Sequence, residues 1–211
     1  MHSRDWKRIV VIGDVHGCIR ELRHLLDKLA PGLDDLVLFT GDLIRKGPDS
    51  AAVLHLVNSQ PHFFSVRGNG EEKFLQKRAH VPTLTVRDRQ RVRDWPVMVS
   101  WDGNVLVHAG VHPHRPLERQ RYQELLTLRS LHHGSDYRPP FWFEHYSGKR
   151  RVIFGHTVSR KPILAPCAVG LDTGCVYGGH LTAYDTTNDR FISVPGRHAY
   201  QGRAAWGYYT P

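Results

Sequence analysis

Cysteine is scarce in this chain of 211 residues, which contains only Cys18, Cys167 and Cys175. None of them belongs to a CxxC pair, and three is an odd number for a set of disulfides. The sequence therefore predicts neither a disulfide framework nor a cysteine zinc site. Free thiols are typical of the reducing cytoplasm, and we expect the protein there.

Long apolar runs are also missing. No stretch approaches the roughly 20 consecutive apolar residues of a membrane-spanning helix. The start of the chain, MHSRDWKRIVVIG, lacks an apolar signal region with a small-residue cleavage site. Hydrophobic residues make up 40% of the chain and charged residues 23%, which is ordinary globular usage. We therefore expect a single domain over residues 1–211 with a sizeable core and no membrane partner.

Acidic residues are few relative to basic ones, with 20 Asp and Glu against 29 Lys and Arg and a formal net charge of +9. This balance favours polyanionic partners such as phosphates, nucleotides or nucleic acid. The basic run at residues 87–93 is typical of a solvated helical face, and the chain has no RNA-binding signature, so nucleic acid is not the expected partner. Histidine is plentiful, with 15 copies, which prompts a search for metal ligands.

Apolar runs of strand length alternate with segments of helical period, a pattern that predicts an α/β layered fold. Strands are expected over residues 8–12, 36–40, 63–66, 97–101, 105–107, 152–154, 163–169, 180–184 and 191–194. Helices are expected over residues 18–29, 50–57, 71–78 and about 122–131. The polar and aromatic residues 113–149 are interpreted as a cap or insertion.

Five motifs of the sequence each follow a predicted strand and place Asp, His or Asn beside glycine. They are GDVHG (13–17), GDLIRKGP (41–48), GNGE (68–71), HAGV (108–111) and GHT (155–157). In open α/β sheets ligands bind beyond the carboxyl ends of the strands, and glycine lets the backbone approach them closely. Pooling these loops gives a candidate ligand set of Asp14, His16, Asp42, Asn69, His108 and His156.

The candidate set combines carboxylate, amide and imidazole groups without thiolate, which suits manganese, iron, nickel or zinc. Asp14 and His16 are two residues apart, so both side chains point to the same side of an extended segment. Six ligands suit two ions better than one, and a carboxylate such as Asp42 could bridge them. Taken singly, a strand-end Asp or Asn is more often a turn or capping residue, but five such motifs in order predict a metal site.

These motifs resemble the calcineurin-like metallophosphoesterases, whose pattern is GDxHG, GDxxxRG, GNH(D/E), a histidine in HAG or HGG, and GH. The resemblance covers residues 9 to about 194. The segments GDLIRKGPDS, VHAGV, FGHT and LDTGCVYGGHLTAYD are most similar to the branch of symmetrical diadenosine tetraphosphatases and bacterial protein phosphatases. The resemblance implies a two-sheet αββα sandwich with a dinuclear metal site at the C-terminal edge of the strands.

The resemblance also implies a distribution of ligands and a reaction. Asp14, His16 and Asp42 would hold one divalent ion, and Asp42, Asn69, His108 and His156 the other, with manganese expected first and iron, zinc, nickel or cobalt as alternatives. Two cations lower the pKa of a bridging water, so that hydroxide attacks phosphorus in line and no protein nucleophile is needed.

Charge on the phosphoryl oxygens needs fixed donors, and Asn69 with one or two basic residues can supply them. Lys46 stands where the family has the arginine of GDxxxRG. Arg129, in LLTLRSL, resembles a family segment with a phosphate-binding arginine, although an arginine on a helix is usually a solvated face.

The sequence departs from the family at Gly70, which replaces the histidine that normally protonates the leaving oxygen. Arg45 replaces the aspartate that orients this histidine in protein phosphatases, and diadenosine tetraphosphatases also lack that aspartate. General acid catalysis is typically worth about 10²–10⁴-fold for poor leaving groups. We therefore expect a hydrolase of dinucleoside polyphosphates acting on phosphoanhydride or phosphoester bonds. The alternatives are a phosphodiesterase or protein serine/threonine phosphatase, which would act on a phosphoprotein, and a catalytically impaired relative that binds metal and a polyanion.

Two further questions stay open at the level of sequence. His112 and His114 are either substitute proton donors or surface histidines. The aromatic side chains of residues 113–149 either stack on a nucleotide base or pack this segment onto the sandwich; they are Tyr137, Phe141, Trp142, Phe143 and Tyr146.

Overall fold

Strands and helices alternate in the expected order in the computed structural model, which describes residues 6–202 and 209. The strands are β1 (Arg8–Ile12), β2 (Asp35–Phe39), β3 (Phe63–Ser65), β4 (Met98–Trp101), β5 (Asn104–Val107), β6 (Arg151–Phe154), β7 (Ile163–Ala165), β8 (Ala168–Gly170), β9 (His180–Asp185) and β10 (Arg190–Pro195). The helices are α1 (Ile19–Leu29), α2 (Ser50–Ser59), α3 (Asn69–Leu75), α4 (Val86–Arg93), the 3-10 helix η2 (Leu117–Arg119), α5 (Tyr122–Thr127) and α6 (Trp142–His145).

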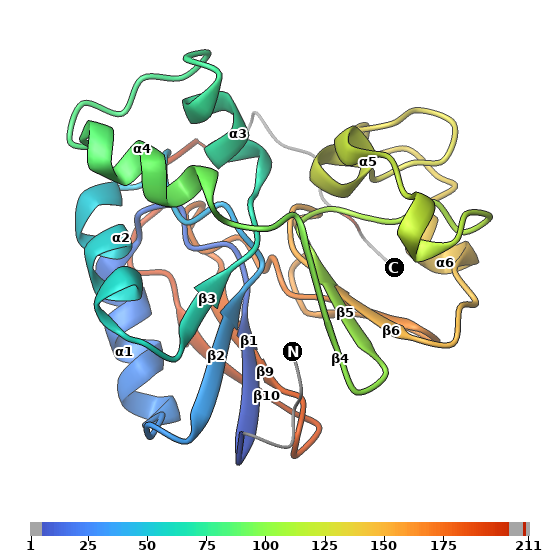
Figure 1. The fold of residues 1–211 in the computed structure, drawn as a ribbon, viewed down its shortest axis with the longest axis horizontal. Coiled ribbons are helices and arrows are strands. Elements are labelled where there is room, and N and C mark those ends of the chain that lie inside the picture. The colour runs from blue at the N-terminus through green and yellow to red at the C-terminus, as the bar shows by residue number, and fades with distance from the viewer. Residues whose placement is uncertain (1–5, 203–208, 210–211) are drawn as a thin grey trace.

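Two mixed sheets of five strands face each other (Figure 1). The first has the order β10-β9-β1-β2-β3, in which β1, β2 and β3 are parallel and β9 runs antiparallel to β1. The second has the order β4-β5-β6-β8-β7, in which β5, β6 and β8 are parallel and the two edge strands are antiparallel. The parallel strands of both sheets end at one edge of the sandwich, where their loops meet.

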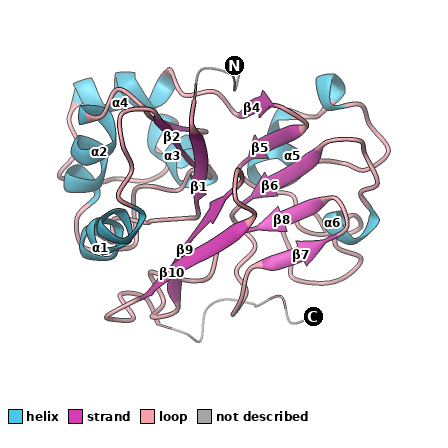
Figure 2. Cartoon of the chain, turned by 90° about the horizontal axis from the view of Figure 1, so that it is seen from below, coloured by secondary structure: helices cyan, strands magenta, loops and turns pink. Residues whose placement is uncertain are grey.

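Alternating side chains of β1 explain how the layers hold together. Ile9 and Val11 pack between the two sheets, while Val10 and Ile12 pack under α1 and α2. Successive side chains of a strand point to opposite faces, so a strand that is apolar throughout must be covered on both sides. Figure 2 shows α1 and α2 beside the first sheet and α6 beside the second. The expected αββα sandwich is confirmed.

Residues 113–149 cover the outer face of the second sheet. Trp142 is fully buried, and its ring centroid lies 4.9 Å from that of Phe154 in β6. Phe141, Phe143 and Tyr146 are buried in the same cluster, so packing, not base stacking, accounts for these aromatic rings. The helix expected over 122–131 ends at Thr127.

Two other expected elements were wrong in detail. Residues 163–169 form the hairpin β7–β8 instead of one strand, because the chain turns at Pro166, which has no N–H to donate to a ladder. Helix α3 begins at Asn69, two residues before the expected start, because the Glu71 carboxylate accepts the backbone N–H of Gly68, 2.9 Å away, and caps the helix there.

The basic run at residues 87–93 is helical, as the sequence indicates, but it is not purely a solvated face. Val92 is fully buried, and the Arg89 guanidinium lies 4.1 Å from the ring centroid of Phe74. The helices of the described part of the chain include none that is both long and apolar enough to cross a membrane.

Candidate metal centre

Loops from both sheets bring the predicted ligands to one cavity of about 270 Å³ at the carboxyl ends of the parallel strands. It is lined by Asp14, His16, Asp42, Lys46, Asn69, Arg129, Tyr137, His156, Val158, Asp172 and Tyr177. His108 lies behind this lining, fully buried and directed at Asp42. The sequence motifs thus converge, although the chain separates the first from the last by more than 140 residues.

The carboxylate of Asp42 lies between two histidines. Its Oδ2 is 3.4 Å from Nε2 of His16, and its Oδ1 is 3.7 Å from Nε2 of His108. The rings of His108 and His156 are 4.9 Å apart at their centroids. Ligand atoms of Asp14, His16 and Asp42 all lie within 4.8 Å of one another. One oxygen of Asp42 therefore faces each half of the cluster, the position expected of a bridging carboxylate.

Three of these side chains are carried by left-handed backbone, with φ of 49° at His16, 47° at Asp42 and 60° at His156. Such conformations are uncommon outside glycine and cost free energy, and they concentrate at functional sites. Gly41, with φ of 91°, also allows a close approach, because a Cβ there would lie 2.6 Å from the backbone nitrogen of Gly68. The loops after β2 and β3 are thereby pressed together around Asp42.

Backbone carbonyls fix which nitrogen of each imidazole faces the cluster. Nδ1 of His16 lies 3.2 Å from the carbonyl oxygen of Ile44, and Nδ1 of His108 lies 2.8 Å from that of Thr40. A carbonyl only accepts, so Nδ1 carries the proton and Nε2 keeps its lone pair. Nε2 of His108 and of His156 are buried without a hydrogen-bond partner within the described residues. These unpartnered lone pairs beside carboxylates fit a divalent metal.

Glu71, the last residue of GNGE, holds the loop that carries Asp42. Its Oε2 accepts the N–H groups of Asp42 and Gly68 at 2.8 and 2.9 Å. Its Oε1 accepts those of Leu43 and Ile44 at 2.8 and 3.2 Å. The buried Glu71 carboxylate thus satisfies four backbone donors. It fixes the position of Asp42, although Glu71 itself does not line the cavity.

The lack of a side chain at Gly70 lets the Asp42 carboxylate approach the backbone of α3. The Gly70 N–H donates to Oδ1 of Asp42 at 2.6 Å, and a Cβ at residue 70 would lie only 2.7 Å from the same oxygen. A histidine at this position would therefore require the Asp42 carboxylate to move.

The electrostatics of the cluster keep its imidazoles neutral. Burial, followed by the charge of Lys46, lowers the pKa of His16 to about 3, and burial also lowers the pKa of His108. Burial, Asp172 and Asp42 together raise the pKa of Asp14. Burial raises the pKa of Asp42 as well, but contacts with the His108 and His16 imidazoles and the charge of Lys46 outweigh it and hold the pKa below its usual value. Crowded carboxylates beside neutral imidazoles are an arrangement that cations stabilise.

Lys46 supplies a positive charge inside the cluster. Its Nζ lies 2.8 Å from Nε2 of His16 and donates to the lone pair that would face a metal. It also lies 5.2 Å from the ring centroid of Tyr177. The ammonium therefore has to turn away from His16 before that nitrogen can bind a cation, which would leave it free to contact a phosphate.

Arg129 lines the same cavity and does not lie on a helix. One guanidinium nitrogen donates to the carbonyl oxygen of His156 at 2.7 Å and the other to that of Ser135 at 2.7 Å. The guanidinium also stacks on the ring of Tyr137, 4.4 Å from its centroid. This residue is held rigidly at the rim of the cluster, so the solvated helical face considered from the sequence was wrong.

Asp172 and Tyr177 were not assigned to the site from the sequence, whereas Tyr137, one of the aromatic residues considered for base stacking, does line the cavity. Asp172 is 5% exposed and follows β8 in the segment LDTG, so the signal of an Asp near glycine after a strand was present. The histidines proposed as substitute acids do not line the cavity. The backbone N–H of His112 donates to the Gln120 side chain, and His114 is exposed.

Comparisons with known proteins agree with this geometry. Residues 7–160 match the family described as calcineurin-like phosphoesterase. The chain is 30% identical to the asymmetrical bis(5'-nucleosyl)-tetraphosphatase PrpE of Halalkalibacterium halodurans, over 89% of this chain and 93% of the relative. It is 23% identical to the symmetrical bis(5'-nucleosyl)-tetraphosphatase of Wigglesworthia glossinidia brevipalpis, over 87% of this chain and 97% of the relative.

A solved structure is similar over most of its length. The crystal structure of a candidate diadenosine tetraphosphatase superposes with a TM-score of 0.83 at 32% identity, covering 90% of this chain and 93% of that one. A protein serine/threonine phosphatase from Saccharomyces cerevisiae shares the fold, with a TM-score of 0.61 at 16% identity, covering 92% of this chain and 81% of that one.

Proposed function

Because the chain belongs to the calcineurin-like phosphoesterase family, and is thus a metallophosphoesterase, we propose that it hydrolyses dinucleoside polyphosphates. The observation that supports this most strongly is the convergence of the strand-end ligands on one cavity, with the Asp42 carboxylate between His16 and His108. The relatives named as tetraphosphatases favour a nucleotide polyphosphate as substrate.

Members of the family use a dinuclear divalent metal site, and we propose that manganese fills it here, because the donors are carboxylate, imidazole and amide groups. Asp14, His16 and Asp42 would hold one ion, and Asp42 with Asn69, His108 and His156 the other. When bound, such a pair of ions activates water and neutralises charge on the phosphoryl group.

The side chains of this protein orient the phosphate. We propose that Lys46 and Arg129, which line the cavity on different loops, bind phosphoryl oxygens, with the amide of Asn69 as a neutral donor. Arg129 is already fixed by its bonds to the carbonyls of His156 and Ser135, so it pays little entropy on binding. Lys46 acts as a mobile point charge.

No general acid stands at residue 70. Glycine cannot donate a proton, and neither His112 nor His114 lines the cavity. A poor leaving group such as a serine alkoxide therefore gains no protonation from these residues, whereas a nucleotide leaving from an anhydride needs none. The site is consequently suited to phosphoanhydrides.

A second pocket adjoins the cavity and supports a substrate with several phosphates. It has a volume of about 430 Å³ and shares Lys46 with the metal cavity. Arg45 and His80 also line it, together with Gln201. We propose that it receives the part of the polyphosphate that extends beyond the reacting group.

The substrate class can be tested with leaving groups of graded basicity. With manganese present, kcat/KM is measured for diadenosine tetraphosphate, a series of aryl phosphates and a phosphoserine peptide. We expect kcat/KM to fall steeply as the leaving group becomes more basic, and the tetraphosphate to exceed the peptide by about 10²-fold or more.

The control variants His112→Ala and His114→Ala should show the same dependence of kcat/KM on leaving-group basicity as the wild type. A flat dependence, or a peptide cleaved as well as the tetraphosphate, would favour a protein phosphatase with another acid. Binding of the tetraphosphate without turnover would favour an impaired relative. Either result would overturn the proposal.

We also propose that the enzyme works in the cytoplasm. Cys18, Cys167 and Cys175 are free thiols, which supports a reducing cytoplasm.

A further inference from the structure

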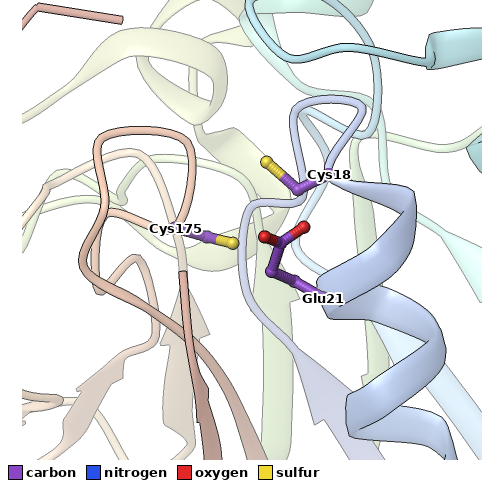
Figure 3. Close-up of side chains that lie close together, drawn as sticks. All are labelled: Cys18, Glu21 and Cys175. Atoms are coloured by element: carbon purple, nitrogen blue, oxygen red, sulfur yellow. The ribbon is translucent and has the colours of Figure 1, made fainter. Parts of the chain in front are cut away.

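Two cysteines and a glutamate form a buried cluster next to the metal cavity (Figure 3). Cys18 precedes α1, Glu21 lies in its first turn, and Cys175 lies in the loop between β8 and β9. They are 0%, 2% and 1% exposed, respectively. In Figure 3 the Cys175 sulfur and the Glu21 carboxylate face each other from these two segments, and Cys18 lies beside them at the start of α1.

The carboxylate of Glu21 is only half satisfied. Its Oε1 accepts the backbone N–H of Arg197 at 3.1 Å, whereas Oε2 is buried without a hydrogen-bond partner within the described residues. A buried carboxylate oxygen without a partner is costly, so its occurrence beside two thiols needs an explanation. A cation between them would supply one.

The spacing of the three groups suits a soft divalent ion. One ligand atom from each of Cys18, Glu21 and Cys175 can be chosen so that all lie within 4.8 Å of one another. In a tetrahedral zinc site, with Zn–S of about 2.3 Å and Zn–O of about 2.0–2.2 Å, neighbouring ligand atoms are about 3.3–3.8 Å apart. Closure around an ion therefore needs the ligand atoms to approach one another by at most about 1–1.5 Å.

The surroundings favour ligation in one further way. The Arg197 N–H orients the carboxylate through Oε1 and leaves Oε2 to bind, which is a typical outer-shell arrangement of metal sites.

We propose that Cys18, Glu21 and Cys175 form a third metal site, separate from the dinuclear cluster, that binds one zinc ion or a similarly soft divalent cation. Water would complete the coordination. The expectation that this chain has no cysteine zinc site then fails, because Cys18 and Cys175 are 157 residues apart and no local spacing joins them.

The role of the site is to tie two loops of the phosphoesterase centre together. Cys18 follows directly on the GDVHG loop with Asp14 and His16, and Cys175 lies three residues after Asp172. An ion that crosslinks these segments stabilises the folded state, since the unfolded chain does not hold the ligands together. The proposal does not depend on which phosphate ester the protein hydrolyses.

Cobalt(II) is the probe, because only thiolate ligands give it intense charge-transfer absorption in the near ultraviolet. The full-length protein, reduced and freed of metal, is titrated with cobalt. We expect the absorption to saturate at one thiolate-bound cobalt per chain, while the dinuclear site takes up cobalt without it, and zinc to abolish it by displacement. The same absorption should persist in Cys167→Ser and in Asp42→Asn, since neither residue belongs to the cluster, and the latter separates this site from the dinuclear one.

The ligands are tested by substitution and by thiol counting. Cys175→Ser should abolish the absorption, and Glu21→Gln should weaken cobalt binding by about tenfold or more. If either variant fails to fold, the wild-type protein still tests the proposal. Zinc should slow the reaction of two of its three thiols with a thiol reagent, while the half-buried Cys167 reacts as before. Absence of the absorption in the reduced wild-type protein, its survival in folded Cys175→Ser, or a mass showing a Cys18–Cys175 disulfide under reducing conditions would overturn the proposal.

Discussion

At the scale of single residues, the site is built from side chains whose second polar atom is already held. His16 and His108 use Nδ1 to bind carbonyls and present Nε2. Asp14 accepts the Thr40 hydroxyl at 2.7 Å through Oδ1. Such outer partners orient ligands before a metal arrives and reduce the entropy lost on binding.

Replacing Lys46 should weaken the binding of the phosphoryl group without unfolding the protein. Replacing it in Lys46→Met removes a donor from the phosphoryl group, and we expect kcat/KM for diadenosine tetraphosphate to fall by about 10²-fold. Lys46→Arg should recover part of this loss because it restores the charge. Steady-state kinetics check both, with the exposed Lys161→Met as control. Activity of Lys46→Met within twofold of wild type would show that Lys46 does not bind the phosphoryl group.

The identity of most site residues could be predicted from the sequence because each stands in a strand-end motif beside glycine. Asp172 lies in a similar motif, but the apolar run of residues 163–169 before it predicts one strand where the chain forms a hairpin. Tyr177 could not be found in this way, because it reaches the cavity from an irregular segment with no periodic pattern, and Tyr137 was expected only as one of several aromatic residues that could stack on a base. Their position depends on packing between residues distant in the chain.

At the scale of elements, the start of α3 determines where Asp42 lies. Glu71→Gln leaves one acceptor oxygen for the four N–H groups that the carboxylate now binds, and places an amide N–H₂ against some of them. We expect the free energy of unfolding to fall by about 2–3 kcal/mol, measured by urea denaturation. The exposed Glu118→Gln should change it little. Equal stability of the two variants would show that Glu71 does not hold the loop.

The pairing of β1 with β2 gives a pH-dependent prediction. Arg8 pairs with Asp35 across the two strands, and the guanidinium donates to the carboxylate at 2.6 Å. Burial raises the pKa of Asp35, but hydrogen bonds from Arg8 and Gly32 outweigh it and hold the pKa below its usual value. A lowered pKa in the folded state adds stability above the unfolded pKa of about 3.9 and loses it as the pH falls through the folded value.

Asp35→Asn should therefore be less stable than wild type by about 1–2 kcal/mol at neutral pH, and the difference should shrink as the pH falls below about 4. Urea denaturation across this range measures it, with the exposed Asp27→Asn as control. A difference that stays constant down to acid pH would mean that the charge of Asp35 contributes nothing.

The hydrophobic period predicts whether a segment is a helix or a strand. It does not predict the residue at which that helix or strand ends. Pro166 divides an apolar run that otherwise resembles one buried strand. Helix α5 ends at Thr127 because Leu128 turns extended, with ψ of 124°, and Ser130 then pairs with Gly134 and Phe141. Pro166 in the first case and the pairing of Ser130 in the second set these ends, and neither belongs to the hydrophobic period.

At the scale of the whole molecule, the two sheets each supply part of the centre. Asp42 follows a strand of the first sheet and His108 a strand of the second, so the sandwich must close before the ligands meet. The net charge of +9 would draw a multiply charged phosphate toward the protein. We propose that this shared cluster is one metal centre that hydrolyses a nucleotide polyphosphate.

The most direct test measures kcat/KM for diadenosine tetraphosphate with manganese in the wild type, Asp42→Asn and the control Asp27→Asn. Loss of a bridging carboxylate removes several kcal/mol of charge stabilisation, so we expect Asp42→Asn to lose about 10³-fold or more, and a chelator to abolish wild-type activity. Asp27→Asn should match the wild type. Activity of Asp42→Asn within about tenfold of wild type, or turnover that survives the chelator, would contradict the account.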